Sequence, residues 1–412
     1  MKYISPPYLL VYTSAVFFIA IIFPPDLYEY FIGEYDLIYL DLKTILFYLI
    51  CCFSFFIGYF SFPNINFNVK FYGDNTLRNF NFSLMLSFCM ALIGAFLIYN
   101  ALSSDDLIFD LLISANGAVI KDELSPDGFG GLFNIFFIAF YWHLYFSFCM
   151  GFNYNNEFQK RIIKIILFIS FILITLSSIV KLARGELLPF LVGIFIIHVS
   201  IFFKGNIKLN IKFFAAAFKL GIFVFIIFSA FSILRGELDF YKIVADFIGY
   251  ILASYNKLAF ILNGKLVYPY GGTGVYFSSF LSFNGTLNGF FGISNYMSWP
   301  KYVDLWNSEF QAVASAGLNQ YLIWPSALGY LFLDFGWGAG FVLIMYGGIY
   351  KIVWSLWLSK TSIGIILYPW FAFCLLFWFG TNYLLDTKLL VYFIVGLFLT
   401  LLNFLGKNYG TS

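Results

Sequence analysis

Two stretches of the sequence read Arg-Gly-Glu-Leu and begin at Arg184 and Arg235. An arginine guanidinium is a permanently charged planar fork that suits phosphate or carboxylate oxygens, and a glycine beside it lets a large anion approach the backbone. Lys181, three residues before Arg184, adds a third positive charge. We interpret these three residues as an anion site. The alternative is that they anchor helix ends in the headgroup region or pair with nearby acids.

Three acidic side chains are candidates to accept a proton. Asp334 lies inside an apolar stretch, roughly 10 Å below the expected membrane surface, where an acid is costly and usually functional. Glu237 and Glu186 each follow an arginine by two residues, and we rank them second and third as general bases. A hydrogen-bonded structural acid near a helix end is the alternative interpretation of Asp334.

Aromatic and amide side chains alternate in the long segment 234–326. Aromatic rings stack on the apolar faces of sugars and amides bond sugar hydroxyls, so the composition favours a glycan groove. The alternative is an interfacial belt of aromatic residues. The candidate glycan-binding residues are Trp299, Tyr302, Trp306, Asn319 and Trp324.

The elements that must position these residues are predicted to be membrane helices. Of the 412 residues, 61% are hydrophobic and only 11% are charged, well below the roughly 25% of a soluble domain. The apolar runs reach about 20 residues, the length of a transmembrane helix, and lack the alternation of a membrane barrel. We therefore predict an all-α, polytopic membrane protein of about ten spans that forms one domain, residues 1–412. The predicted spans are 8–22, 44–62, 82–102, 132–152, 162–180, 187–203, 213–231, 327–350, 363–379 and 389–404.

The charge distribution predicts the orientation of these spans. Alternate connections are rich in Lys and Arg, whereas the first and third connections are acidic, and positively charged connections stay cytoplasmic. Both termini are therefore expected in the cytoplasm, and segment 234–326 outside it as a large loop with short amphipathic helices. Residues 240–262 are amphipathic, which favours an interfacial or re-entrant helix over another span.

Several kinds of chemistry find no support in the sequence. It contains no nucleotide-binding loop, no paired-histidine metal motif and no serine-nucleophile elbow. The five cysteines lie in apolar runs without metal-ligand spacing, and a net charge of +2 does not indicate nucleic acid. We expect no cofactor and no metal.

The layout resembles the Wzy-type O-antigen polymerases, which join oligosaccharide repeat units at bacterial inner membranes. The resemblance covers the whole chain and depends on the Phe- and Ile-rich spans, the large late loop, the Arg-Gly turns at Arg184 and Arg235, and the sequence LGYLFLDFGWGAG at 328–340. It implies glycosyl transfer between two undecaprenyl-diphosphate-linked glycans at the periplasmic face, within the lipid bilayer. A chain-length regulator protein is an optional further partner.

The resemblance also assigns roles to the candidate residues. The cations would stabilise the departing diphosphate, an acid would deprotonate the attacking hydroxyl, and the loop would bind sugar. The related O-antigen ligases have a similar layout but use a histidine in the periplasmic loop, and segment 234–326 has none. Ligase remains an alternative, as does a flippase for lipid-linked oligosaccharides, although no half-length repeat is visible.

Overall fold

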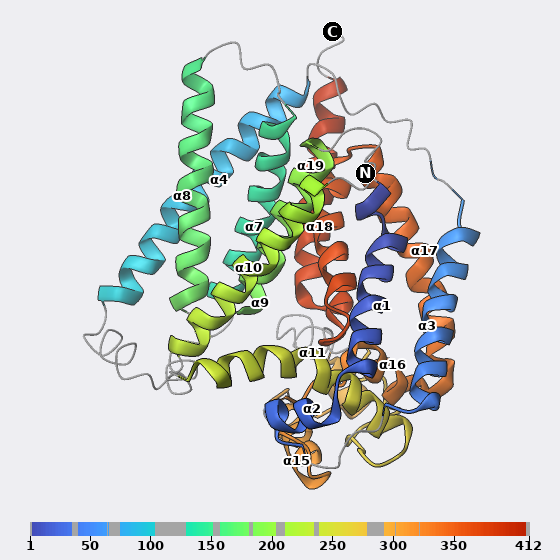
Figure 1. Ribbon diagram of the computed structural model, residues 1–412. Coiled ribbons are helices and arrows are strands. Elements are labelled where there is room, and N and C mark those ends of the chain that lie inside the picture. Colours follow the sequence, from blue (N-terminus) through green and yellow to red (C-terminus); the bar gives the residue numbers. More distant parts are fainter. Residues whose placement is uncertain are drawn as a thin grey trace.

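The computed structural model describes residues 2–34, 40–63, 65, 75–103, 129–150, 157–180, 184–202, 211–234, 239–277, 292–300, 302–320 and 322–408. This part of the chain is 83% helical and has no strand, as predicted (Figure 1). The long helices are α1 (Pro6–Ile22), α3 (Leu42–Ser61), α4 (Asn75–Ser103), α7 (Phe129–Cys149), α8 (Glu157–Val180), α9 (Arg184–Phe202), α10 (Ile211–Leu234), α11 (Phe240–Leu262), α17 (Ala339–Leu358), α18 (Ser362–Leu376) and α19 (Thr387–Asn408). The short ones are η1 (Lys2–Ile4), α2 (Pro25–Ile32), α14 (Ile293–Met297), α15 (Tyr302–Ser315), α16 (Ser326–Phe335), η2 (Gly336–Gly338) and η3 (Tyr383–Leu385).

Five helical stretches of the described part are long and apolar enough to cross a membrane: Leu42–Ser61, Glu157–Ser178, Gly185–Phe202, Phe240–Leu262 and Ser326–Leu358. The bent pair α1 and α2 would add a sixth. Shorter apolar helices occupy the other predicted spans. The helices thus support a polytopic membrane protein, and the count of about ten spans stays a prediction.

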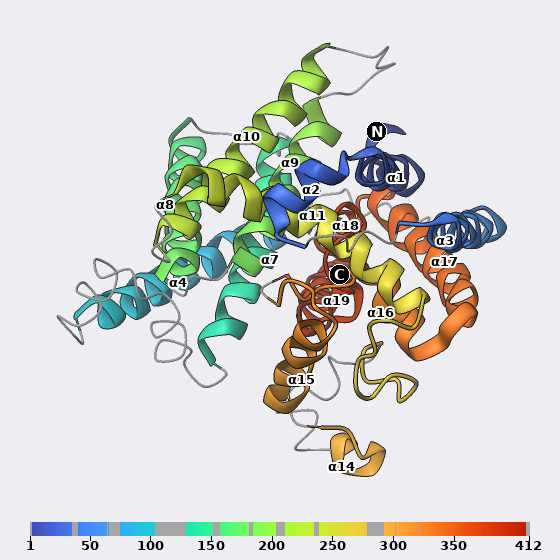
Figure 2. The ribbon, with the colours of Figure 1, turned by 60° about the horizontal axis from the view of Figure 1, so that its bottom comes forward.

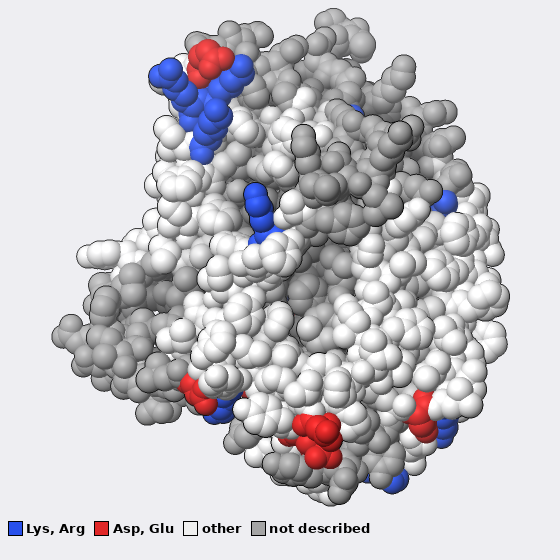
Figure 3. Space-filling view, in the orientation of Figure 1, with Lys and Arg blue, Asp and Glu red and all other residues white. Residues whose placement is uncertain are grey.

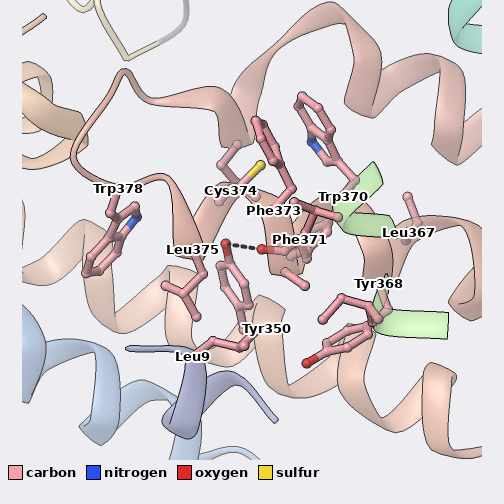
Figure 4. Packing of buried hydrophobic residues seen from close by; sticks show 14 of the residues in the cluster. Leu9, Tyr350, Leu367, Tyr368, Trp370, Phe371, Phe373, Cys374, Leu375 and Trp378 are labelled. Carbon is pink, nitrogen blue, oxygen red and sulfur yellow. Dashed lines mark hydrogen bonds between the residues drawn. The ribbon is translucent and has the colours of Figure 1, made fainter. Parts of the chain in front are cut away.

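Helix α18 lies at the centre of the bundle, in contact with α1, α7, α9, α17 and α19. Nearly all of its side chains are buried, and Figure 4 shows part of this core, where the Tyr350 hydroxyl donates to the Phe371 carbonyl (3.1 Å). Helices α3 and α17 pack backbone to backbone beside it. A Cβ atom at Gly58 would lie 1.9 Å from the Ile344 carbonyl oxygen, and one at Gly347 would lie 2.2 Å from that of Phe55. Glycine is therefore needed at both positions, as is common where membrane helices meet.

The two ends of the bundle differ. Helix α1 begins and α19 ends at one end, which we name the terminal end, whereas α2, α11, α15 and α16 lie at the opposite end, which we name the loop end (Figures 1 and 2). On the face in Figure 3, charged side chains gather towards the two ends, and the band between them carries few. This distribution fits a membrane around the middle of the bundle.

One detail of the loop end was not predicted. The chain turns by 99° between α1 and α2 at Pro24 and Pro25, because proline ends one helix and readily starts the next. Helix α11 meets the length and hydropathy test for a span, yet in Figure 1 it runs across the bundle at the loop end. The interfacial or re-entrant placement expected for 240–262 stays a prediction.

Candidate functional site

The first Arg-Gly-Glu-Leu stretch forms the start of α9. Arg184 is the first residue of this helix, and Glu186 lies in its first turn, where the helix dipole favours a negative charge. Lys181, Arg235 and Glu237 lie outside the described residues, as do the side chains of Arg184 and Tyr302. The predicted anion site therefore stays a prediction, but the structure shows the surroundings of Glu186.

One polar side chain bonds Glu186, and an ion pair at the start of α19 lies within electrostatic range of it. The Asn134 amide of α7 donates to Glu186 Oε2 (2.5 Å), and Lys388 of α19 forms an ion pair with Asp386 (2.7 Å). Glu186 also interacts electrostatically with Lys388. We name Asn134, Glu186, Asp386 and Lys388 the α9–α19 cluster. Sequence reasoning missed three of its members, although two charged residues at 386 and 388, beside an apolar run, were a signal.

This cluster lies at the loop end. The Ala327 amide at the start of α16 donates to the Trp378 carbonyl just after α18 (2.8 Å), and the Trp324 ring packs against that of Tyr383, with centroids 6.4 Å apart. The segment that leads into Asp386 therefore contacts the end of the large loop. Two charged side chains of the cluster are only partly buried: Lys388 is 17% exposed and Asp386 is 27% exposed.

Asp334 holds a loop in place. Its Oδ1 accepts the Gly274 amide (3.1 Å) and its Oδ2 accepts the Phe277 amide (2.6 Å), while the Leu333 carbonyl accepts the Gly272 amide (2.9 Å). Both carboxylate oxygens thus bind backbone at the last turn of α16, just before the break at Gly336 (φ +54°). This geometry favours the structural interpretation of Asp334, and its role as a base stays a prediction.

The predicted glycan-binding residues differ in their surroundings. Trp299 is buried and donates to the Thr273 carbonyl (3.0 Å), and Asn319 donates through its side chain to the Ile32 carbonyl (3.2 Å), so both have internal partners. Trp306 packs on Phe310 and is partly exposed. Trp324, also partly exposed, is the candidate that contacts the segment before Asp386.

A buried ion pair fixes the loop end. Lys257 of α11 and Glu34, which follows α2, are joined at 3.1 Å, and both side chains are inaccessible to solvent. Glu34 also accepts the Tyr28 hydroxyl (2.5 Å), the Asn256 amide (3.3 Å) and the Asn319 backbone amide (2.9 Å). This network ties α2, α11 and the segment after α15 together.

Glu309 of α15 is a second buried acid of the loop. It is 4% exposed and accepts the Tyr330 hydroxyl (3.0 Å). Burial raises the pKa of this carboxyl to about 8, against the lowering effect of the Tyr330 hydrogen bond. Glu309 is therefore mostly protonated at neutral pH.

Comparisons with known proteins add no assignment: the chain matches no protein-family model, and no curated protein and no solved structure shows significant similarity to it. Within the described residues, no group of three or more His, Cys, Asp and Glu side chains could hold a metal ion. The function is therefore inferred from the chain's own residues.

Proposed function

We propose that the protein is a membrane glycosyltransferase that polymerises undecaprenyl-diphosphate-linked repeat units at its loop end, which would face the periplasm of a bacterial inner membrane. The observation that carries this proposal is the α9–α19 cluster. It brings an oriented carboxylate, Glu186, to the loop end within two residues of Arg184, a predicted ligand of the diphosphate. A base and an anion site side by side suit this transfer.

The proposed reaction needs no cofactor. A hydroxyl oxygen of one repeat unit attacks the anomeric carbon of the growing chain, and the bond from that carbon to the diphosphate oxygen breaks, its electron pair leaving with undecaprenyl diphosphate. The hydroxyl proton passes to a carboxylate, for which Glu186 is now the best-supported candidate. The hydrogen bond from Asn134 orients Glu186 through Oε2, and no described residue donates a hydrogen bond to Oε1. That oxygen would receive the proton.

The cations and the loop have distinct parts in this proposal. Arg184, Arg235 and Lys181 would bind the diphosphate, whose charge grows as the glycosidic bond breaks. Lys388 is already neutralised by Asp386 at 2.7 Å, so it is less suited to that task. Trp324, which contacts the segment before Asp386, would be the loop residue that guides a glycan into the site.

The proposal is tested by the glycans of a strain that lacks this protein. A single repeat unit capped onto its carrier would support a polymerase, whereas no attached glycan would support a ligase or a flippase. Re-expressing Glu186→Gln should leave the single repeat, because the amide keeps the size of the side chain but cannot take the proton. Glu157→Gln is the matched control, since Glu157 also starts a helix, α8, but is exposed and pairs only with Lys160 among the described residues.

A further inference from the structure

Two buried donors beside the α9–α19 cluster lack hydrogen-bond partners. Trp370 of α18 and Tyr392 of α19 are fully buried, and within the described part neither the Trp370 indole N–H nor the Tyr392 hydroxyl has a partner. A buried donor without a partner costs about 1 to 3 kcal/mol. An unsatisfied buried group in a native protein therefore calls for an explanation, such as a functional role or a bound water or ion.

The rings that carry the two donors pack on each other, and Lys388 lies beside one of them. The rings of Trp370 and Tyr392 have centroids 5.5 Å apart, and the Lys388 ammonium lies 5.8 Å from the Trp370 ring. Tyr392 also lies within electrostatic range of Glu186 and Asp386. Figure 4 shows Trp370 among the buried residues of α18.

Their depth is similar. Trp370 and Tyr392 lie about one and a half turns from the loop-end termini of α18 and α19. The partly exposed charges of Lys388 and Asp386 lie nearer that surface, and the two donors lie below them.

The chemistry of these groups favours a neutral, hydroxyl-rich ligand over an anion. The described charges are one ammonium and two carboxylates, so the cluster bears one net negative charge from these side chains. An indole N–H and a phenol O–H are neutral donors for hydroxyl or ring oxygens, and carboxylates accept hydrogen bonds from hydroxyls. A diphosphate would instead meet Glu186 and Asp386 at close range.

We propose that Trp370, Tyr392 and Lys388 form a subsite for the terminal sugar of the acceptor glycan, whose attacking hydroxyl then lies against Glu186. This inference rests on the proposed function, because it assigns the acceptor end of that reaction. The residues bind and orient the sugar and take no part in proton transfer. The subsite extends the candidate site from the loop into the helix bundle.

The test uses the purified full-length protein in detergent and the water-soluble oligosaccharide released by mild acid from the host's own lipid-linked repeat unit. This oligosaccharide should raise the unfolding temperature of the wild-type protein. Tyr392→Phe removes one hydroxyl from an unchanged ring and should need a ~3- to 10-fold higher saccharide concentration for the same shift, the effect of one lost hydrogen bond. Trp370→Phe should act in the same direction.

Tyr255→Phe is the matched control, because the Tyr255 hydroxyl is also buried without a hydrogen-bond partner among the described residues, but its ring packs on Phe17 of α1 and Tyr48 of α3. It should bind the oligosaccharide like the wild-type protein. Inorganic pyrophosphate is the second probe, and Tyr392→Phe should leave its effect unchanged. A loss of pyrophosphate binding in Tyr392→Phe would assign the subsite to the leaving group and overturn the proposal.

Other results separate the subsite from the proposed function. Equal saccharide binding by wild-type and Tyr392→Phe proteins, or no binding by the wild-type protein, would overturn the subsite. A lower stability of unliganded Tyr392→Phe with unchanged saccharide binding would show that the hydroxyl holds a buried water instead. A wild-type protein that binds the saccharide but never polymerises repeat units would keep the subsite and refute the proposed function.

Discussion

Removing either charge of the Glu34–Lys257 pair should destabilise the protein, and the two losses should be unequal. Taking one partner from a buried ion pair costs about 3 to 5 kcal/mol, because the other charge stays buried and uncompensated. After Lys257→Met, the carboxylate keeps three neutral donors, from Tyr28, Asn256 and Asn319. After Glu34→Gln, the Lys257 ammonium loses its only counter-charge among the described residues. Glu34→Gln should therefore be the more destabilising change.

The double variant provides the magnitude of the coupling. With Glu34→Gln and Lys257→Met together, no charge is left buried, and neutral replacement of a buried pair is often close to neutral in stability. The double variant should thus be more stable than either single variant, with a coupling free energy of about 3 kcal/mol or more.

These free energies are measured by reversible unfolding in mixed micelles, followed by tryptophan fluorescence. Glu157→Gln is the control, since it breaks the solvent-exposed Lys160–Glu157 pair and should leave the unfolding midpoint unchanged. Additive single effects would refute the argument that the pair is coupled across a dry interface. If Lys257→Met lowered the free energy of unfolding more than Glu34→Gln, the three neutral donors would not stabilise the Glu34 carboxylate as argued.

Three further predictions concern the loop and the anion site. Burial raises the pKa of Glu309 from its unfolded value of 4.5 to about 8, so its contribution to stability should be complete below pH 4.5 and be lost as the pH rises to about 8. Unfolding temperatures measured from pH 4 to 9 should therefore vary less in Glu309→Gln than in the wild-type protein. An equally steep pH profile in both proteins would contradict this prediction. Asp334→Asn replaces one acceptor oxygen by an amide donor that faces a backbone N–H, so hydrogen exchange at the Gly274 and Phe277 backbone amides should become faster. Unchanged exchange at these amides would show that Asp334 does not hold the loop. Arg→Ala at Arg184 or Arg235 should abolish polymerisation at matched protein levels and Arg→Lys should retain part of it, because lysine lacks the fork; full-length polymer from both Arg→Ala variants would rule out their diphosphate role.

The helices could be predicted from the sequence because membrane spans are local features. A helix in lipid satisfies its own backbone, so a run of apolar residues is enough to indicate one, and each predicted span falls on a helix or, for 327–350, on the broken pair α16 and α17. Residues 240–262 likewise form the expected helix, and its interfacial or re-entrant placement stays a prediction. The bend between α1 and α2 was missed, although Pro24-Pro25 marks it.

The candidate site was less predictable because its contacts join distant parts of the chain. Asn134 and Glu186 come from different helices, and Lys388 reaches the same place from the last helix. Glu34 and Lys257 likewise meet across more than half of the chain. Residue types mark such side chains as costly in an apolar setting, but only the packing of helices shows which of them meet.

The same limit applies to Asp334 and Trp299. Their residue types favoured a base and a sugar platform, whereas the structure gives Asp334 two backbone partners and buries Trp299. An acid near a helix end can bind backbone amides and a tryptophan in a loop can pack in the interior. The sequence alone does not separate these structural roles from functional ones.

The central claim is that the loop end joins repeat units and releases undecaprenyl diphosphate. The most direct measurement adds lipid-linked repeat units to liposomes that contain only this protein and follows glycan length together with free undecaprenyl diphosphate. The account predicts a ladder of longer glycans, one undecaprenyl diphosphate released for each new linkage, and neither product with Glu186→Gln. Single repeat units that stay unlinked with the wild-type protein, or that only change leaflet, would contradict it.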